Sequence, residues 1–272
     1  MGDDEVWGQF PFGQPNSRRP MRLPSSGEPE ALVVGVYPSA FHVAWTPPGH
    51  NGRPLIGSLA VDVEPVVFWA GDDPTPADEF ERWVRDVGFD PERHGRTRPG
   101  HNGPSGTGLV SEILTPLGLD AAQVAFSDAV PWFFVKYGKG SQGAAIAERF
   151  APLAEQLGVH PGSLPTRPRT SELPKIAGGD RRRDTFRAEL LEAGAPLIIT
   201  LGQEAVDALG AVADDSTGLP RRLAPEAYGR RGSVAMDGYR FEVLPLAHPG
   251  FLRQTNDQVW RAAFDGWKLN PT

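Results

Sequence analysis

Short and almost uninterrupted apolar segments constrain the fold of this chain more than any other feature. Leu32–Val36, Pro196–Leu201 and Val243–Leu246 contain hardly any polar residue. Strands of this kind are buried on both faces, which is typical of a parallel sheet covered by helices on each side. Segments with helical spacing lie between them, for example Ala77–Val87 and Arg181–Ala193. We therefore predict an α/β fold, a three-layer sandwich with a mainly parallel central sheet flanked by helices.

The same patterns predict how the rest of the chain is organised. The 272 residues are 39% hydrophobic, enough for one large core, and we expect a single domain over residues 29–272. Residues 1–28 are rich in Gly, Pro, Ser and Arg and are predicted to form an irregular arm, docked through Trp7, Phe10 and Phe12. Further strands are expected at Ser58–Glu64, Val66–Trp69 and Gln123–Ala129, and further helices at Leu109–Leu117 and Asn256–Trp267.

Composition excludes several classes of chemistry. The chain has no cysteine, which rules out disulfides, a thiolate nucleophile and cysteine-ligated iron–sulfur clusters. No group of His, Asp or Glu has metal-ligand spacing, and no glycine-rich segment has the spacing of a nucleotide-binding loop. We therefore expect no metal and no cofactor. No segment approaches the ~18 apolar residues of a membrane span, and no signal peptide is recognisable, so we expect a cytoplasmic protein. We also expect a monomer.

The net charge of −7 argues against a protein that coats nucleic acid. Such affinity comes from neutralised phosphates, for which a local basic patch is sufficient. Arginines gather at five places that are candidates for such a patch: Arg18–Arg22, Arg181–Arg183, Arg221–Arg222, Arg230–Arg231 and Arg253.

Two of the apolar strands end in sharp turns that contain proline. The first turn is G-V-Y-P-S at Gly35–Ser39, and the second is H-P-G-F-L at His248–Leu252. Ligands of open α/β sheets bind beyond the carboxyl ends of the strands, so we expect a site there. The two turns resemble the signature motifs of the uracil-DNA glycosylase superfamily, a G-x-x-P turn and an H-P-S/G turn followed by a wedge residue. The apolar strand that ends at Gly202 is also typical of that superfamily.

The resemblance implies a monofunctional DNA glycosylase. Such an enzyme flips a base out of DNA and hydrolyses its N-glycosidic bond, leaving an abasic site. His248 matches the motif histidine that hydrogen-bonds the base while negative charge develops on it. Leu252 matches the wedge that enters the duplex, and Phe251 is the alternative wedge. Gly250 replaces the usual serine and leaves the backbone free to approach the phosphate.

Other residues are implied as DNA contacts or pocket residues. Arg253 lies beside the second motif, and Ser105 and Gly106 lie in a segment that resembles the family's Pro/Ser loop at the DNA backbone. Gly35 and Pro38 belong to the turn that lines the base pocket.

The chain differs from the resembled family at the position of the residue that activates water. Tyr37 stands where many members carry Asp or Asn, and a phenol is a poor general base at neutral pH. His42 occupies the position at which some branches have a carboxylate, and a neutral imidazole can accept a proton near pH 7. Asp62 and Glu64 are further candidates at the end of the next strand.

Two positions indicate a base other than plain uracil. Val61 stands in place of the aromatic residue that stacks on uracil, which widens the pocket. Asp128 stands in place of a base-reading Asn. A carboxylate only accepts hydrogen bonds, so it suits an exocyclic amine such as cytosine N4.

Several functions stay open at this point. The target is either a modified or cytosine-type base, including hypermodified phage DNA attacked in antiviral defence, or uracil and other deaminated bases in DNA repair. A different class is a catalytically silent nucleic-acid-binding module of the same fold, which Tyr37 and the negative net charge favour. A hydrolase of free nucleosides is a third alternative and needs no wedge.

Overall fold

The computed structural model describes residues 6–25 and 27–271, without the side chains of residues 253 and 254. The chain forms two compact units, and it crosses from one to the other between Tyr37 and Pro38, inside the first proline-bearing turn. The sequence predicts an arm over residues 1–28 and a single domain over residues 29–272. Each of these two predicted parts contributes residues to both units. The first unit contains the residues up to Arg19, Pro38–Pro104 and Trp132–Arg167. The second contains Pro20–Tyr37, Ser105–Pro131 and the residues from Pro168 onward.

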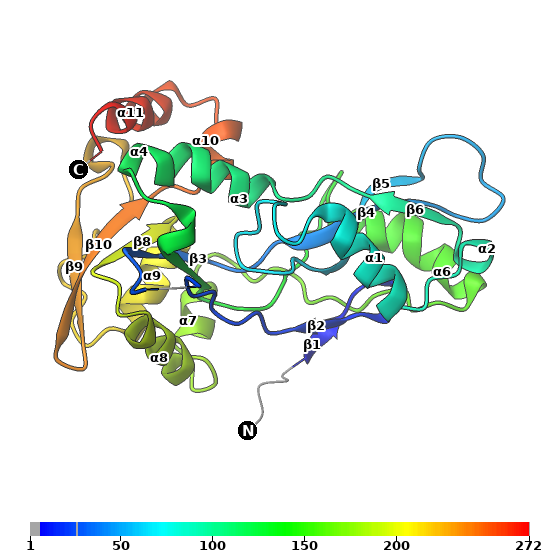
Figure 1. Ribbon diagram of the computed structural model, residues 1–272, viewed down its shortest axis with the longest axis horizontal. Coiled ribbons are helices and arrows are strands. Elements are labelled where there is room, and N and C mark those ends of the chain that lie inside the picture. The colour runs from blue at the N-terminus through cyan, green and yellow to red at the C-terminus, as the bar shows by residue number, and fades with distance from the viewer. Residues whose placement is uncertain (1–5, 26, 272) are drawn as a thin grey trace. The chain divides into compact units, whose positions relative to one another are not determined.

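The second unit is built around a five-stranded sheet with the order β7-β3-β8-β10-β9 (Figure 1). Four of these strands run parallel, and β9 pairs antiparallel with β10 at one edge. This mixed α/β architecture with a mostly parallel sheet confirms what the apolar segments predict. The strands are β3 (Ala31–Gly35), β7 (Val124–Asp128), β8 (Leu197–Leu201), β9 (Gly232–Met236) and β10 (Tyr239–Leu246).

Helices pack around this sheet. In the view of Figure 1, α7 and α8 lie below the sheet, and α4 and α11 lie above it. Gly118 and Gly194 follow α4 and α8 in the left-handed conformation, which glycine adopts readily at the end of a helix. The helical segments are α3 (Pro104–Leu109), η2 (Val110–Leu114), α4 (Thr115–Leu117), η3 (Ala121–Gln123), α7 (Leu173–Ala177), α8 (Arg183–Ala193), α9 (Gln203–Val212), η5 (Pro225–Ala227), α10 (Pro249–Gln254) and α11 (Gln258–Leu269).

The first unit contains a three-stranded antiparallel sheet with the order β5-β4-β6. Its apolar core includes Trp45, Trp83 and Phe150, all fully buried. The elements are β1 (Val6–Gln9), η1 (Pro11–Gly13), β2 (Pro15–Ser17), β4 (Ala40–Thr46), β5 (Ile56–Val63), α1 (Pro76–Asp86), α2 (Pro91–His94), β6 (Arg96–Pro99), α5 (Gln142–Ala145), η4 (Ile146–Phe150) and α6 (Ala151–Leu157).

The N-terminal segment is more ordered than the sequence predicts. Val6–Gln9 pairs with Pro15–Ser17 in a two-stranded antiparallel sheet, so the prediction of an irregular arm is wrong for these residues. The predicted docking through aromatic residues is confirmed. Phe10 is fully buried, and the Phe12 ring packs with its centroid 5.0 Å from that of Phe150.

Two local predictions fail because side-chain or backbone chemistry outweighs the apolar pattern. Val66–Trp69 forms a turn rather than a strand, since the Glu64 carboxylate accepts hydrogen bonds from the amides of Phe68 and Trp69. The helix predicted to begin at Leu109 begins at Pro104, and proline suits the first turn of a helix because it needs no donor there.

Candidate functional site

The carboxyl edge of the second unit's sheet brings together the residues that follow its parallel strands. Gly35 at the end of β3 pairs directly with Asp128 at the end of β7. His248 follows β10, which is separated from β3 only by β8. Neighbouring strands lie about 4.8 Å apart, so the backbones of β3 and β10 are about 10 Å apart at this edge. Gly35, Tyr37, Asp128 and His248 therefore belong to one edge of one sheet.

Backbone hydrogen bonds beyond the strand ends fix this edge. The amide of Ala129 donates to the Gly35 carbonyl at 3.1 Å, and the amide of Val130 donates to the Val36 carbonyl at 2.9 Å. On the other side of β3, Gly202 donates to the Leu246 carbonyl at 2.7 Å. Gly202 has a φ of +94°, which favours glycine at this turn between β8 and α9. The ends of β7 and β3, and of β8 and β10, are thereby held in pairs.

His248 is half-buried and caps helix α10 with its side chain. Its Nδ1 atom accepts a hydrogen bond from the Gly250 amide at 3.0 Å. A nitrogen that accepts a hydrogen bond carries a lone pair, so the proton of the neutral imidazole lies on Nε2. A side chain at position 250 would bring its Cβ to 3.1 Å from Nδ1 of His248. Gly250 thus permits the close approach that orients the ring, and the ring presents Nε2–H as a donor.

Phe251 and Leu252 differ sharply in exposure. Phe251 is 45% exposed, and its ring packs edge-on against Trp260 with centroids 5.6 Å apart. Leu252 is only 6% exposed and lines a cavity of about 230 Å³ together with Pro249 and Phe264. An apolar side chain that is already packed has little surface to offer a duplex. Of the two residues predicted as wedge candidates, Phe251 is therefore the exposed one and Leu252 the packed one.

The other predicted DNA contacts have different surroundings. Ser105 and Gly106 lie in the first turn of α3, not in a loop, and Gly106 is buried. Their backbone amides therefore belong to a helix start. The side chain of Arg253 lies outside the described residues, so its predicted phosphate contact stays a prediction.

The backbone carbonyl of Asp128 is bonded to a buried ion pair that the sequence did not predict. Arg182 is 2% exposed and donates to the carbonyl of Asp128 at 2.8 Å and to that of Ala129 at 3.0 Å. Its guanidinium also pairs with Glu189 at 2.6 Å. In the sequence, Arg182 is one of three consecutive arginines and looks like a surface residue. The helical pattern could have shown that Glu189 is buried. It follows the apolar Phe186 by three residues and thus lies on the same, buried face of α8.

The remaining predicted site residues lie in the first unit. They are Pro38, His42, Val61, Asp62 and Glu64. Pro38 is buried, and Val61 is fully buried in the apolar core. Core packing accounts for a valine at position 61, and its role as a pocket residue stays a prediction.

His42 lies in β4, with its backbone paired to a side chain. Its amide donates to Oδ1 of Asn102 at 2.8 Å, and Nδ2 of Asn102 donates to the His42 carbonyl at 3.0 Å. Burial lowers the pKa of the imidazole to about 4. His42 is therefore neutral at pH 7, as the prediction of a base requires. The low pKa also makes it a much weaker base than a free imidazole.

Asp62 and Glu64 are buried carboxylates with different partners. Asp62 accepts from Arg82 at 2.7 Å and from the Val63 amide at 2.8 Å, so each of its oxygens has a donor. Burial raises the pKa of Asp62 against these interactions. Glu64 accepts from the Ser39 amide at 3.1 Å and donates its own amide to the Ser39 carbonyl at 3.0 Å. Burial raises the pKa of Glu64 to about 7.

Because the pKa of Glu64 is raised in the folded chain, we expect the free energy of unfolding to depend on pH. The folded chain holds the Glu64 proton up to about pH 7, whereas the unfolded chain releases it near pH 4.5. The stability that this proton contributes is complete below about pH 4.5 and is lost as the pH rises through 7. Glu64→Gln stays neutral at every pH. Relative to the wild type, its free energy of unfolding should therefore rise by about 3 kcal/mol between pH 4.5 and pH 8.

Urea unfolding across this pH range measures the effect. Glu81→Gln in α1 of the same unit is the matched control, because Glu81 is exposed and stays in water. A difference between wild type and Glu64→Gln that does not change with pH would contradict the assignment of the neutral-pH titration to Glu64.

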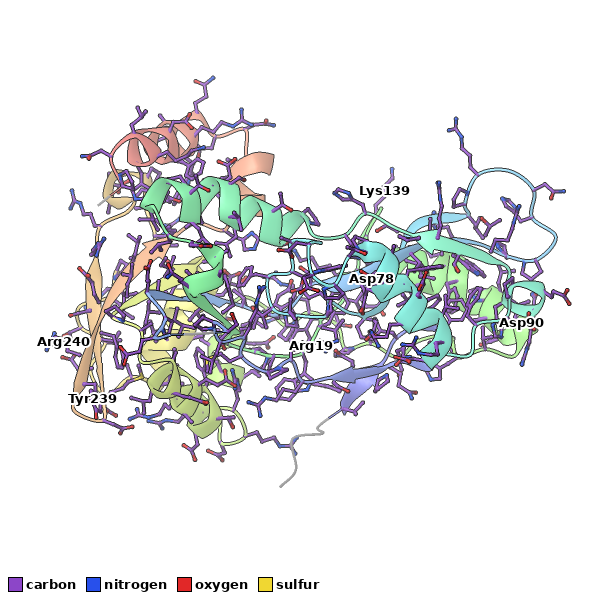
Figure 2. The ribbon with its side chains drawn as sticks, viewed as in Figure 1. Arg19, Asp78, Asp90, Lys139, Tyr239 and Arg240 are labelled. Carbon is purple, nitrogen blue, oxygen red and sulfur yellow. The ribbon has the colours of Figure 1, made fainter. Side chains whose placement is uncertain are left out.

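The arginine clusters divide into buried and exposed groups. Arg182 is buried, and Arg19 is a half-buried residue that donates to the Val63 carbonyl at 3.3 Å (Figure 2). Arg221, Arg222 and Arg230 are exposed. At the β9–β10 turn, Tyr239 and Arg240 are also exposed (Figure 2), but they lie at the amino end of β10, opposite to the end that leads to His248.

Comparisons with known proteins do not identify a family for this chain. No protein-family model matches it, and no curated protein matches it. Within residues 6–25 and 27–271, no helix has the length and apolar character needed to cross a membrane. Among the same residues, no three His, Asp or Glu side chains are grouped so as to hold a metal ion.

Proposed function

We propose that this protein is a DNA glycosylase that hydrolyses the N-glycosidic bond of a flipped-out base and leaves an abasic site. We also propose that the fold is the three-layer sandwich of uracil-DNA glycosylase-like proteins. One observation carries it: the two turns that resemble the superfamily's motifs begin at the same carboxyl edge of a parallel sheet. That edge is where α/β sheets bind ligands.

The proposed chemistry assigns one task to His248. The bond between the base nitrogen and the sugar C1′ breaks, and its electron pair leaves with the base. Nε2–H of His248 donates to the base carbonyl that gains negative charge, as the Gly250–Nδ1 hydrogen bond orients it to do. The oxygen of a water molecule then bonds to C1′, and the proton that the water loses passes to the departing base, which leaves as a neutral molecule. A dissociated, oxocarbenium-like sugar demands little of a general base, which makes Tyr37 in the place of an acid tolerable.

Asp128 is the proposed base-selecting residue. It ends β7 directly beside Gly35, where the first motif begins, and its side chain is buried, with 4% exposed. An ionised carboxylate accepts hydrogen bonds only, so it pairs with an exocyclic amine and not with a carbonyl. The proposed target is therefore a cytosine-type or modified base, including the hypermodified cytosines of phage DNA in an antiviral role. Repair of uracil or other deaminated bases is the alternative within the same reaction.

Asp128→Asn tests this selection and should shift the preference toward uracil. The new amide donates to uracil O4 and accepts from N3–H, whereas the carboxylate only accepts. We expect the ratio of kcat/KM for uracil over the cytosine-type substrate to rise about 10- to 100-fold, since a bidentate base contact contributes about 1–3 kcal/mol of discrimination. Asp128→Ala serves as the control, because it removes both patterns and should lower both rates. An unchanged ratio in Asp128→Asn would rule out base selection by this residue.

The test of the function itself is abasic-site formation on a panel of DNAs, detected by alkaline strand cleavage. The panel contains uracil, hypoxanthine, cytosine, 5-hydroxymethylcytosine and glucosylated phage DNA. Cleavage confined to a cytosine-type base supports the proposal as stated, and cleavage at uracil supports the repair alternative.

A second candidate function is a catalytically silent module that binds nucleic acid at the same edge. Tyr37 favours it, because it stands where many superfamily members have the residue that activates water. Duplex binding without cleavage of any substrate in the panel would establish this alternative.

A further inference from the structure

Arg182 is a buried charge with several hydrogen bonds near the carboxyl edge of the second unit's sheet. Its Nε donates to the Ala129 carbonyl at 3.0 Å, and one terminal nitrogen donates to the Asp128 carbonyl at 2.8 Å. The guanidinium forms a fork with Glu189 through bonds of 2.6 and 2.7 Å. It also packs 4.9 Å from the centre of the Phe186 ring.

Ser127 extends this arrangement into β7 itself. Its hydroxyl donates to the Glu189 carboxylate at 2.7 Å. Side chains alternate between the two faces of a strand, so Ser127 faces α8 and the neighbouring Asp128 side chain faces the other way. Arg182, Glu189 and Ser127 together hold β7 from the α8 side, through two carbonyls and one hydroxyl.

The same segment of β7 is bonded to the first motif. Ala129 and Val130, which follow Asp128, donate their amides to the carbonyls of Gly35 and Val36. Any displacement of the β7 end therefore moves Asp128 and the turn that leads to Tyr37 together.

We propose that Arg182 is a positioning residue that fixes Asp128 against the Gly35 turn and so sets which base the site accepts. The inference rests on the proposed function in naming Asp128 as the base-selecting residue. Arg182 acts through backbone carbonyls and is not itself a catalytic residue.

The energetics of buried ion pairs support a positioning role. A buried pair pays a large desolvation cost, and well-packed apolar residues often stabilise a fold as much or more. Apolar side chains have no hydrogen-bond donors, whereas the planar guanidinium has several donors in a rigid fork. Here the fork reaches two successive carbonyls and a carboxylate at once, and this geometry fixes the strand end in one position.

Arg182→Lys tests the proposal because it keeps the charge and loses the fork. Arg187→Lys is the matched control: Arg187 lies on α8, the helix that directly follows Arg182, and pairs with Asp214 and Asp237 instead of β7. Ser127→Ala is a milder second variant that removes only the hydroxyl bond to Glu189. The first readout, amide hydrogen exchange at Ala129 and Val130, requires no activity. The second is the titration of the Asp128 carboxyl followed by ¹³C NMR, and the third is the ratio of kcat/KM between the two best substrates.

We expect exchange at Ala129 and Val130 to be at least tenfold faster in Arg182→Lys, with a changed Asp128 titration and a selectivity ratio reduced about tenfold. Ser127→Ala should show the same changes to a smaller degree, and Arg187→Lys none of them. Unchanged exchange and titration would overturn the positioning role. Altered exchange with an unchanged selectivity ratio would overturn the role in base selection.

A wild-type protein that excises no base refutes the proposed function and the base-selection role that rests on it. Exchange and the Asp128 titration then still decide whether Arg182 fixes the β7 end.

Discussion

Replacing His248 with alanine should lower abasic-site formation about 100- to 1,000-fold. The variant loses the Nε2–H donor that the Gly250–Nδ1 hydrogen bond orients. Removing one preorganised donor to a developing negative charge costs enzymes a factor of this size in kcat. The measurement is the single-turnover rate on the best substrate of the DNA panel, where product release does not mask the chemical step.

His248→Asn separates catalysis from structure. His248 caps α10, so alanine also removes a capping bond and costs about 1 kcal/mol of stability. Asparagine is a preferred capping residue and can accept the Gly250 amide, but it lacks an imidazole Nε2–H. We expect His248→Asn to be as stable as the wild type and nearly as inactive as His248→Ala. An asparagine variant within a few-fold of wild-type activity would show that His248 only caps the helix.

Phe251→Ala and Leu252→Ala should have opposite effects on activity and stability. Phe251 is 45% exposed, so its loss should change the free energy of unfolding by no more than about 0.5 kcal/mol. Activity on duplex DNA should fall about 10- to 100-fold, and activity on single strands should change little, because the wedge offsets the cost of unstacking. Leu252 is 6% exposed, and its truncation should cost about 2–4 kcal/mol of stability.

Urea unfolding and rates on matched single and double strands distinguish the two residues. Val259→Ala is the control, because Val259 is an apolar residue with 64% exposure on the neighbouring helix α11. A stable Leu252→Ala protein that loses activity on duplexes alone would restore Leu252 as the wedge. Equal loss on single and double strands in Phe251→Ala would contradict a wedge role for Phe251.

Much of the second unit could be predicted from local sequence. Val33 and Ile199 are fully buried or nearly so in central strands, as their apolar neighbours indicate. Their segments are buried on both faces, so the burial pattern identifies a parallel sheet without further information. The grouping of Gly35, Asp128 and His248 at one edge then followed from strand direction alone. The first unit was less predictable: β4, with His42 in it, did not stand out as a strand, and its backbone pairs partly with the Asn102 side chain.

The α/β class, the parallel strands and the residues at their carboxyl ends can all be read from local sequence. These features depend on apolar periodicity and on turn residues a few positions apart. Three features depend on the tertiary fold: Phe251 is exposed while Leu252 is packed, Arg182 is buried against the Asp128 carbonyl, and burial raises the pKa of Glu64 to about 7. Exposure, ion pairing and pKa depend on which distant segments surround a side chain. Contacts such as that between Ser127 and Glu189, 62 residues apart, leave no local pattern in the sequence.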